Sequence, residues 1–313
     1  MTIERREPFP PVFMPQPNAG NLRAVDWDAT LPGFMGSPMS LALFLIVLFA
    51  GLLHASWNAI VKRGRDTLLT TILVTGAAAL ISALLLPWVA APHPRSWPWL
   101  AASTVLQAGY YVLVARTYRM TDMSAAYPLM RGCAPIVVAV VAALLLGERL
   151  PAGAWLGIVL VCGGILCMAH GNQRQHLWLP LLNAGVIATY TLVDAYGARQ
   201  SGSALGYTLW LFLLSGLPLP IWALWTRAPQ LVAYARANWH YGLVGGIGTL
   251  TSYGLALWAM TQAPVAMVSA LRETSIVFAV IISAFVLREQ VRRQRWLAAG
   301  LIVVGVGVLR FAG

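Results

Sequence analysis

The chain has few charged residues for its length. Only 10% of its 313 residues are Asp, Glu, Lys or Arg, whereas 59% are hydrophobic. Soluble domains average about 25% charged residues. A water-soluble protein of this length could not cover its surface with so little charge. The composition therefore excludes a soluble globular protein and indicates a chain surrounded by lipid.

Motifs for common chemistries are also missing. The sequence contains no GxxxxGK[ST] loop, so ATP does not drive a process through this chain, and it has no GxSxG or HExxH motif. The three cysteines, Cys133, Cys162 and Cys167, form no CxxC pair and no metal-ligand spacing. We therefore predict no enzyme activity, no cofactor and no metal site. The net charge of +11 comes mainly from loop arginines, which in a membrane protein reflects topology and lipid headgroups rather than nucleic acid.

What the chain does contain is long apolar segments separated by short polar breaks. A helix needs about 20 apolar residues to cross the hydrocarbon core of a bilayer. The segments lack the alternation of barrel strands, so helices are expected. We predict an all-α integral membrane protein with ten transmembrane helices, at 40–61, 67–90, 97–115, 123–147, 152–170, 177–197, 204–225, 239–260, 264–287 and 296–311.

Residues 1–38 differ from the rest in composition. The stretch REPFPPVFMPQPNAG is rich in proline and has no hydrophobic periodicity, which is typical of disorder. Met35 and Met39 lie just before the first apolar segment. We therefore expect a disordered N-terminal extension and a natural start at one of these methionines.

The remainder is built twice. Arg131 precedes Glu148 by 17 residues, as Arg272 precedes Glu289, and a tryptophan follows each glutamate by seven residues. The predicted halves are 39–171 and 172–313. Because five helices is an odd number, the second half must enter the membrane from the opposite side. Such inverted repeats are a common transporter plan, with the substrate site between the halves near the midplane.

These features resemble a known family. The segments LLLGERL and FVLREQV, each followed by Trp and a glycine-rich helix, together with HASWNAIVK, YPLMRG and LRETSIVFA, are similar to EamA-type transporters of the drug/metabolite transporter superfamily. The resemblance covers about residues 40–312. It implies a ten-helix secondary carrier in the cell membrane, favouring a bacterial inner membrane, and often an exporter of amino acids or other small metabolites. It does not identify the substrate.

Membrane orientation is predicted in two ways that disagree. The family resemblance implies that both termini are cytoplasmic. Of the 21 Lys and Arg residues, two lie inside apolar segments, twelve lie on the side opposite the termini, and seven lie on the side of the termini: Arg5, Arg6, Arg23, Arg95, Arg149, Arg199 and Arg310. Since cytoplasmic loops carry the excess of positive charge, this count favours termini outside.

Ionisable residues inside membrane segments are costly and usually face a partner or a cavity. His54, Arg131, Asp194, Arg272 and Glu273 are such residues. Arg131 has two readings. In the structural one it snorkels to lipid headgroups or pairs with Asp194 or Glu273 to lock helices together; in the functional one it faces the cavity between the halves and binds a carboxylate or phosphate in a bidentate way. Arg272 recurs at the matching position, which favours the functional reading, and it cannot form a good local pair with the adjacent Glu273. Asp194 is expected to pair with an arginine, or otherwise to carry a proton. His54 either bonds a neighbouring helix or touches substrate or a proton.

Polar and aromatic neighbours complete the predicted substrate site. Residues four apart on a helix share a face, which associates Asn58 with His54, Tyr127 with Arg131, and Tyr190 with Asp194. The full set of predicted substrate-binding residues is His54, Trp57, Asn58, Gln107, Tyr111, Tyr127, Arg131, Tyr190, Asp194, Arg272 and Glu273.

The leading functional prediction is a secondary transporter, an exporter of a small carboxylate-bearing metabolite. Protons are a candidate coupling ion. The alternatives are an exporter of organic cations or hydrophobic drugs, for which Asp194 or Glu273 would supply the acidic group, and an accessory membrane protein without transport. The sequence leaves monomer and homodimer open.

Overall fold

A computed structural model describes residues 39–64, 66–169 and 177–312 of the chain. The predicted extension 1–38 and the predicted boundary between the halves at 171/172 lie outside these residues. The described part is helical throughout, with no strand. Its helices are α1 (Leu41–Arg63), α2 (Thr67–Leu85), α3 (Trp97–Met120), α4 (Met123–Leu145), α5 (Ala152–Leu166), α6 (Trp178–Gln200), α7 (Ala204–Gly216), α8 (Pro218–Met260), α9 (Val265–Arg272), α10 (Thr274–Ile281) and α11 (Arg293–Phe311), with short turns η1 (Leu86–Trp88) and η2 (Pro94–Ser96) and a π-helical turn η3 (Ile282–Val286).

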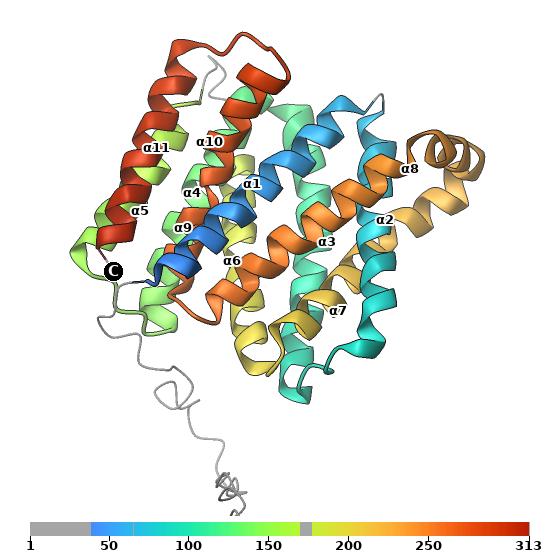
Figure 1. Cartoon of the computed structure of the whole chain (residues 1–313), viewed down its shortest axis with the longest axis horizontal. Helices are drawn as coiled ribbons and strands as arrows, with labels where there is room; N and C mark the ends of the chain where they lie inside the picture. The colour runs from blue at the N-terminus through green and yellow to red at the C-terminus, as the bar shows by residue number, and fades with distance from the viewer. Residues whose placement is uncertain (1–38, 65, 170–176, 313) are drawn as a thin grey trace, which may run out of the picture. The chain divides into compact units, whose positions relative to one another are not determined.

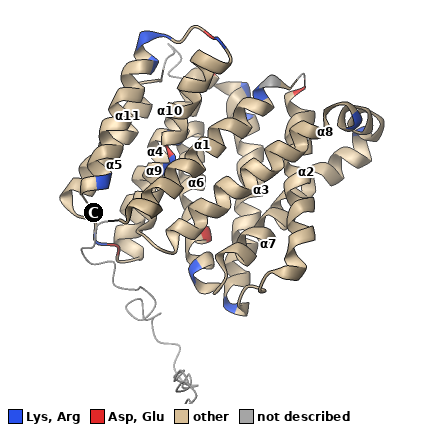
Figure 2. Cartoon of the chain, in the orientation of Figure 1, with Lys and Arg blue, Asp and Glu red and all other residues tan. Residues whose placement is uncertain are grey.

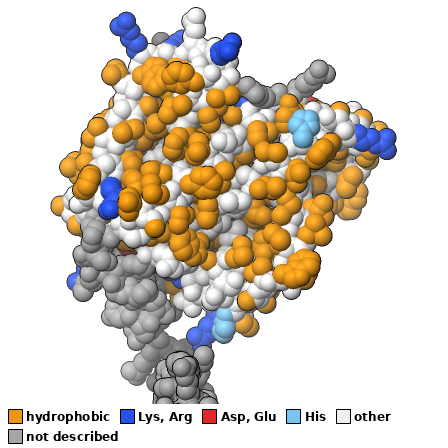
Figure 3. All heavy atoms as spheres, viewed as in Figure 1, with side chains coloured by type: hydrophobic (Ala, Val, Ile, Leu, Met, Phe, Trp, Pro, Cys, Tyr) orange, Lys and Arg blue, Asp and Glu red, His pale blue; other side chains and the backbone are white. Residues whose placement is uncertain are grey.

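The outside of the bundle suits a bilayer. Large apolar side chains such as Leu80, Phe285 and Leu297 are exposed, and Figure 3 shows hydrophobic side chains spread over the face that α1, α8, α10 and α11 present. Basic residues gather toward the ends of the helices (Figure 2). Exposing such an apolar surface to water costs free energy, whereas contact with lipid tails does not.

Six helical segments of the described residues are long and apolar enough to cross a membrane: 41–62, 67–88, 123–145, 204–260, 265–286 and 293–311. The fourth is 57 residues long, which exceeds the roughly 20 residues that one crossing needs. It includes α8, whose backbone leaves helical geometry at Arg227 and Asn238. A further helical segment, 228–237, therefore lies between the predicted segments 204–225 and 239–260.

Glycines allow helices to pack closely, because they have no side chain to hold the backbones apart. A Cβ added to Gly157 would lie 2.6 Å from Leu309 Cγ, and one on Gly153 would lie 2.6 Å from Ala312 Cβ, which brings α5 against the C-terminal helix α11. On α8, a Cβ on Gly246 would lie 2.9 Å from Ala77 Cβ of α2. These glycines therefore serve helix packing.

Helices far apart in the sequence pack together. The first helix, α1, lies against α8, α9 and α10, while α6 lies against α3 and α4. The helices α2 and α7 contact each other, as do α5 and α11. Figure 1 shows α1 and α8 side by side across the front of the bundle. The polar residues of α1, α3, α4 and α6 are thereby brought toward α8 and α9.

The predicted helix at 264–287 is interrupted. α9 ends at Arg272, Glu273 forms a turn, and α10 begins at Thr274. By contrast, α4 continues from Met123 to Leu145 in spite of Pro128 and Pro135. The two arginines singled out by the sequence therefore differ locally, because Arg131 lies within a helix and Arg272 at the end of one.

Candidate functional site

An ion pair joins α4 to the turn between α9 and α10. Arg131 Nε lies 3.0 Å from Glu273 Oε2, and the side chains are 16% and 6% exposed. The N–H does not point at the oxygen, so neither buried atom makes a hydrogen bond within the described residues. The pairing agrees with the staple reading of Arg131. It also leaves hydrogen-bonding capacity unused at both groups.

Arg272 has a different environment. Its guanidinium carbon lies 5.0 Å from the centre of the Tyr253 ring, on α8. In the part of the chain that the structure describes, this arginine has no carboxylate partner at ion-pair distance. A cation over an aromatic face is attracted by the ring quadrupole but keeps its hydrogen-bond donors. Arg272 is therefore equipped to bind an anion.

Asp194 on α6 is buried, and neutral donors surround it. Tyr253 Oη donates to Oδ2 at 2.5 Å, Tyr207 Oη to Oδ1 at 3.1 Å, and Gln107 Nε2 to Oδ2 at 3.3 Å. The expected ion pair with an arginine is thus wrong for Asp194. Its interhelical contacts are hydrogen bonds, because Tyr207 and Tyr253 reach the carboxylate from α7 and α8.

Tyrosines form a second group around Arg131. The Tyr110 ring lies 5.8 Å from both the Tyr111 and the Tyr190 ring, which links α3 to α6. Tyr127, one helical turn before Arg131, interacts electrostatically with that guanidinium and with Glu273. The predicted residues Tyr111, Tyr127 and Tyr190 are therefore brought to one region, together with Tyr110.

On α1, the predicted residues diverge. His54 packs edge-on against Trp57, with ring centroids 5.4 Å apart, and interacts electrostatically with Arg131 and Arg272. The indole N–H of Trp57 is buried and has no hydrogen-bond partner among the described residues. Asn58 is exposed and donates to the His54 carbonyl oxygen at 2.8 Å. Asn58 thus uses its amide within its own helix, while His54 and Trp57 join the cluster.

Sequence reasoning missed Tyr207, which lies 13 residues after Asp194 in the next helix. No spacing rule relates positions on two helices joined by a turn. Tyr253 is also absent from the predicted set, and its double contact with Asp194 and Arg272 depends on α8 crossing the bundle. Within the described residues, no three His, Cys, Asp or Glu side chains gather as metal ligands would.

An apolar exterior around a buried polar cluster defines a multi-pass helical membrane protein. The model of the EamA-like transporter family matches residues 41–169 and 175–311. The chain belongs to the EamA-like transporter family, as the resemblance of its motifs predicts.

Two further proteins are similar to this chain. Protein RarD of Streptomyces exfoliatus is 25% identical over 217 residues, which cover 67% of this chain and 65% of that protein. The match thus spans just under two-thirds of the length of RarD. A crystal structure described only as that of a protein aligns with a TM-score of 0.64 at 16% identity, over 85% of this chain and 94% of the other. At that identity the likeness shows the fold alone.

Proposed function

We propose that the protein is a secondary transporter that exports a small metabolite bearing a carboxylate, such as an amino acid. Two five-helix halves of opposite orientation, ten crossings in all, would expose a central site alternately to each side of the membrane. The observation that carries the proposal is the environment of Arg272, a cation in the polar cluster with an aromatic partner and no carboxylate.

The packing of the helices supports the two inverted halves. If α1 corresponds to α6, α2 to α7, α3 to α8, α4 to α9 and α10, and α5 to α11, the contacts are reciprocal. α1 packs on α8, α9 and α10 as α6 packs on α3 and α4, and α2 packs on α8 as α7 packs on α3. The pairs α2–α7 and α5–α11 map onto themselves. A two-fold relation between halves produces this pattern.

The substrate class follows from the charges in the cluster. Arg272 offers guanidinium donors for a carboxylate, which an arginine binds in a bidentate way. Glu273 Oε2 and Arg131 Nε are buried without hydrogen bonds, so the pair offers one acceptor and one donor. A zwitterion, with a carboxylate for Arg272 and an ammonium group for Glu273, uses both charges.

Asp194 is the best candidate for a coupled proton. Its hydrogen-bond partners are neutral, so a proton on the carboxylate leaves no unpaired arginine beside it. Tyr253 connects it to the substrate site, because the same ring donates to Asp194 and lies under Arg272. Glu273 and His54 are the other candidates, but Glu273 is paired with Arg131.

The second candidate function is export of organic cations. Two observations favour it. Among the described residues Asp194 has no cationic partner at ion-pair distance, and the rings of Tyr207 and Tyr253 lie beside its carboxylate. Aromatic faces and a carboxylate together recognise ammonium groups.

Ligand-dependent thermal stability of the purified protein tests these functions. A ligand that binds only the folded state raises the melting temperature. We expect a rise with amino acids or other carboxylates that is lost in Arg272→Gln and retained in Arg310→Gln, a control arginine in α11 near the C-terminus. Uptake of the stabilising ligand into proteoliposomes then tests transport.

The outcomes separate the two functions. Stabilisation by organic cations alone, lost in Asp194→Asn, would replace the carboxylate proposal by the second one. Carboxylate stabilisation that survives in Arg272→Gln would remove Arg272 from the site. Arg131→Gln is the weaker probe, because it also breaks the ion pair with Glu273.

A further inference from the structure

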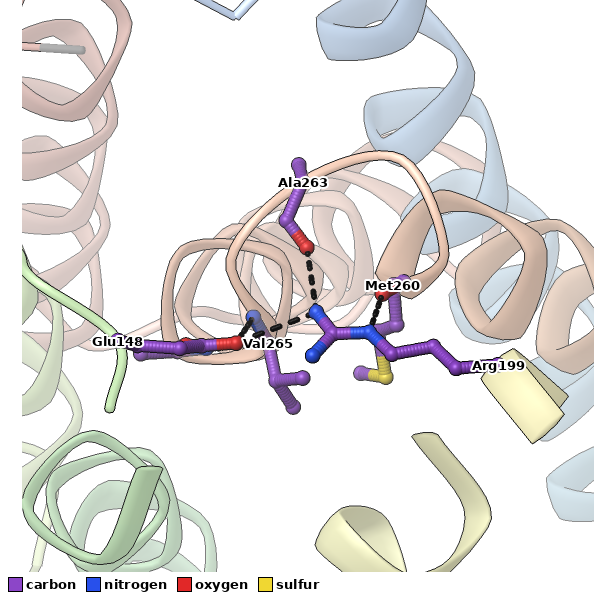
Figure 4. A network of polar contacts seen from close by, with 6 residues as sticks. Glu148, Arg199, Met260, Ala263 and Val265 are labelled. Atoms are coloured by element: carbon purple, nitrogen blue, oxygen red, sulfur yellow. Dashed lines mark hydrogen bonds and ion pairs between the residues drawn. The ribbon is translucent and has the colours of Figure 1, made fainter. Parts of the chain in front are cut away.

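One end of the bundle is held by a buried polar network that the predicted site does not include. Arg199, near the end of α6, lies 3.2 Å from Glu148, with Nη2 facing Oε1. The guanidinium also donates to the Met260 carbonyl at 2.9 Å and the Ala263 carbonyl at 3.2 Å. Figure 4 shows these contacts around the turn between α8 and α9.

Glu148 completes this network from the segment after α4. Its Oε1 accepts from the backbone N–H of Val265 at 2.9 Å, and Oε2 accepts from that of Ala266 at 3.4 Å. The carboxylate therefore caps the first turn of α9, where unpaired N–H groups and the helix dipole favour an anion. The Arg199 and Glu148 side chains are only 10% and 6% exposed. The network excludes water where α6, the α8–α9 turn and the end of α4 meet.

A second ion pair is formed by Lys62 and Glu289, the residues that correspond to Arg199 and Glu148 in the opposite halves. Lys62 Nζ contacts both Glu289 oxygens, at 2.7 and 2.8 Å. Lys62 and Arg199 are each the last residue but one of a 23-residue helix, α1 and α6. Here the side chains are 58% and 41% exposed, so this ion pair, unlike the first, is accessible to solvent.

The local backbone that presents the two glutamates is the same. Gly147 and Arg288 both have positive φ, 66° and 55°, and a glutamate follows each. The Glu148 N–H bonds the Ala142 carbonyl at 3.2 Å, and the Glu289 N–H bonds the Ser283 carbonyl at 2.9 Å. Both bonds reach back six residues, one more than the 6→1 bond of a Schellman helix end. The sequence thus builds the same device twice, while only one copy is buried.

We propose that Glu148–Arg199 and Glu289–Lys62 are the two latches of the transport cycle, closed in turn. A latch is closed when its glutamate caps the helix opposite. Glu148 caps α9, so its latch is closed. Glu289 caps no helix among the described residues and pairs instead with the exposed Lys62, so its latch is open. In the opposite state Glu289 would cap the first turn of α4, the counterpart of α9. In this structure Asp122, the residue before α4, makes no capping bond with its side chain. The proposal rests on the proposed alternating access of two inverted halves.

Latch opening can be measured without transport. Val268 and Tyr127 occupy matching positions 141 residues apart, and are 0% and 37% exposed. Each is replaced by cysteine, in a background lacking Cys133, Cys162 and Cys167. Labelling by a water-soluble methanethiosulfonate reagent is then timed on purified protein. We expect Tyr127→Cys to react at least tenfold faster than Val268→Cys.

Glu148→Gln is then combined with each reporter. We expect labelling of Val268→Cys to accelerate at least tenfold, and that of Tyr127→Cys to slow, because opening one latch closes the other. Glu289→Gln is the matched control and should change the Val268→Cys rate by less than twofold, since that latch is already open. Substrate is not needed, so a failed flux assay would leave these rates informative.

A folded Glu148→Gln protein with unchanged labelling at both reporters overturns the latch. So does acceleration at both reporters, which signals general loosening. If Glu148→Gln does not fold, Arg199→Lys keeps the charge but loses the second contact to the α8–α9 turn. We then expect about threefold acceleration at Val268→Cys, and an unchanged rate overturns the proposal.

Discussion

Arg131 and Arg272 occupy corresponding places in the sequence but have different surroundings. Arg131 lies inside a continuous helix and pairs with Glu273. Arg272 ends α9 and rests on the ring of Tyr253. Glu273, which follows Arg272 in the sequence, thus pairs with Arg131 instead, because side chains of adjacent residues on a helix point about 100° apart. Corresponding residues of two repeats therefore need not have the same contacts or the same role. One arginine holds helices together, and the other keeps its donors available.

The largest effect on stability is expected when each arginine is replaced separately. Arg131→Gln leaves Glu273 buried without its cation, which typically costs about 3–5 kcal/mol. Arg272→Gln loses a cation–π contact of about 0.5–1 kcal/mol. Unfolding of the purified variants, followed by circular dichroism, should rank them in that order.

The double variant Arg131→Gln/Glu273→Gln sharpens the result. We expect it to recover most of the lost stability, because no unpaired charge remains. Equal losses in the two single variants would mean that the arginines are equivalent after all.

The link between Asp194 and Arg272 gives the next largest effect. Tyr253→Phe removes the hydrogen bond to the Asp194 carboxylate, and a bond to a charged group is worth about 1.5–3 kcal/mol. It keeps the ring beneath Arg272. We therefore expect reduced thermal stability but retained stabilisation by a carboxylate ligand.

Tyr207→Phe is the matched control, since it removes the other tyrosine bond to Asp194 without touching Arg272. If Tyr253→Phe also abolished ligand stabilisation while Tyr207→Phe did not, the hydroxyl would take part in substrate binding.

A smaller difference is expected at the two helix ends that present the glutamates. Arg288 adopts the left-handed conformation that Gly147 adopts freely, at a cost of about 1 kcal/mol. Arg288→Gly should therefore raise the free energy of unfolding by up to about that amount. Gly147→Ala should lower it by a similar amount. Thermal unfolding measures both, and a loss of stability in Arg288→Gly would assign the arginine side chain a role of its own.

The smallest effect concerns the exposed ion pair. The hydrogen bond from Lys62 holds the pKa of Glu289 below its usual value. The pair therefore contributes stability above the usual pKa of glutamate, about 4.3, and loses it as pH falls through the lowered pKa. Wild type should melt slightly above Glu289→Gln at pH 7, less so in high salt, and the difference should vanish at a pH below the lowered pKa. A difference that grew toward low pH would contradict this assignment.

Much of the fold could be predicted because it follows from local chemistry. Long apolar segments must be helical in lipid, since backbone groups there have no other partners. The spacing of Arg131 and Glu148, repeated at Arg272 and Glu289, is visible in the sequence itself and indicates two copies of one pattern. The helix within 228–237 could not be found in this way, since it is neither long nor apolar enough to appear as a membrane segment.

The sequence shows which polar residues lie in apolar segments, but not which of them contact each other. His54, Gln107, Tyr190 and Asp194 stand out as polar residues in apolar surroundings, because burying them needs a partner. Which partner each obtains depends on helices that cross from distant parts of the chain. Asp194 receives tyrosines of α7 and α8 rather than an arginine for this reason.

The sequence by itself determined that the chain is helical, enters the membrane, repeats its pattern and belongs with EamA-like transporters, because composition and spacing act locally. The tertiary structure decided which arginine is paired, which glutamate is buried and which end of the bundle is sealed. These depend on contacts between residues up to 227 positions apart in the sequence, and no local rule relates such positions.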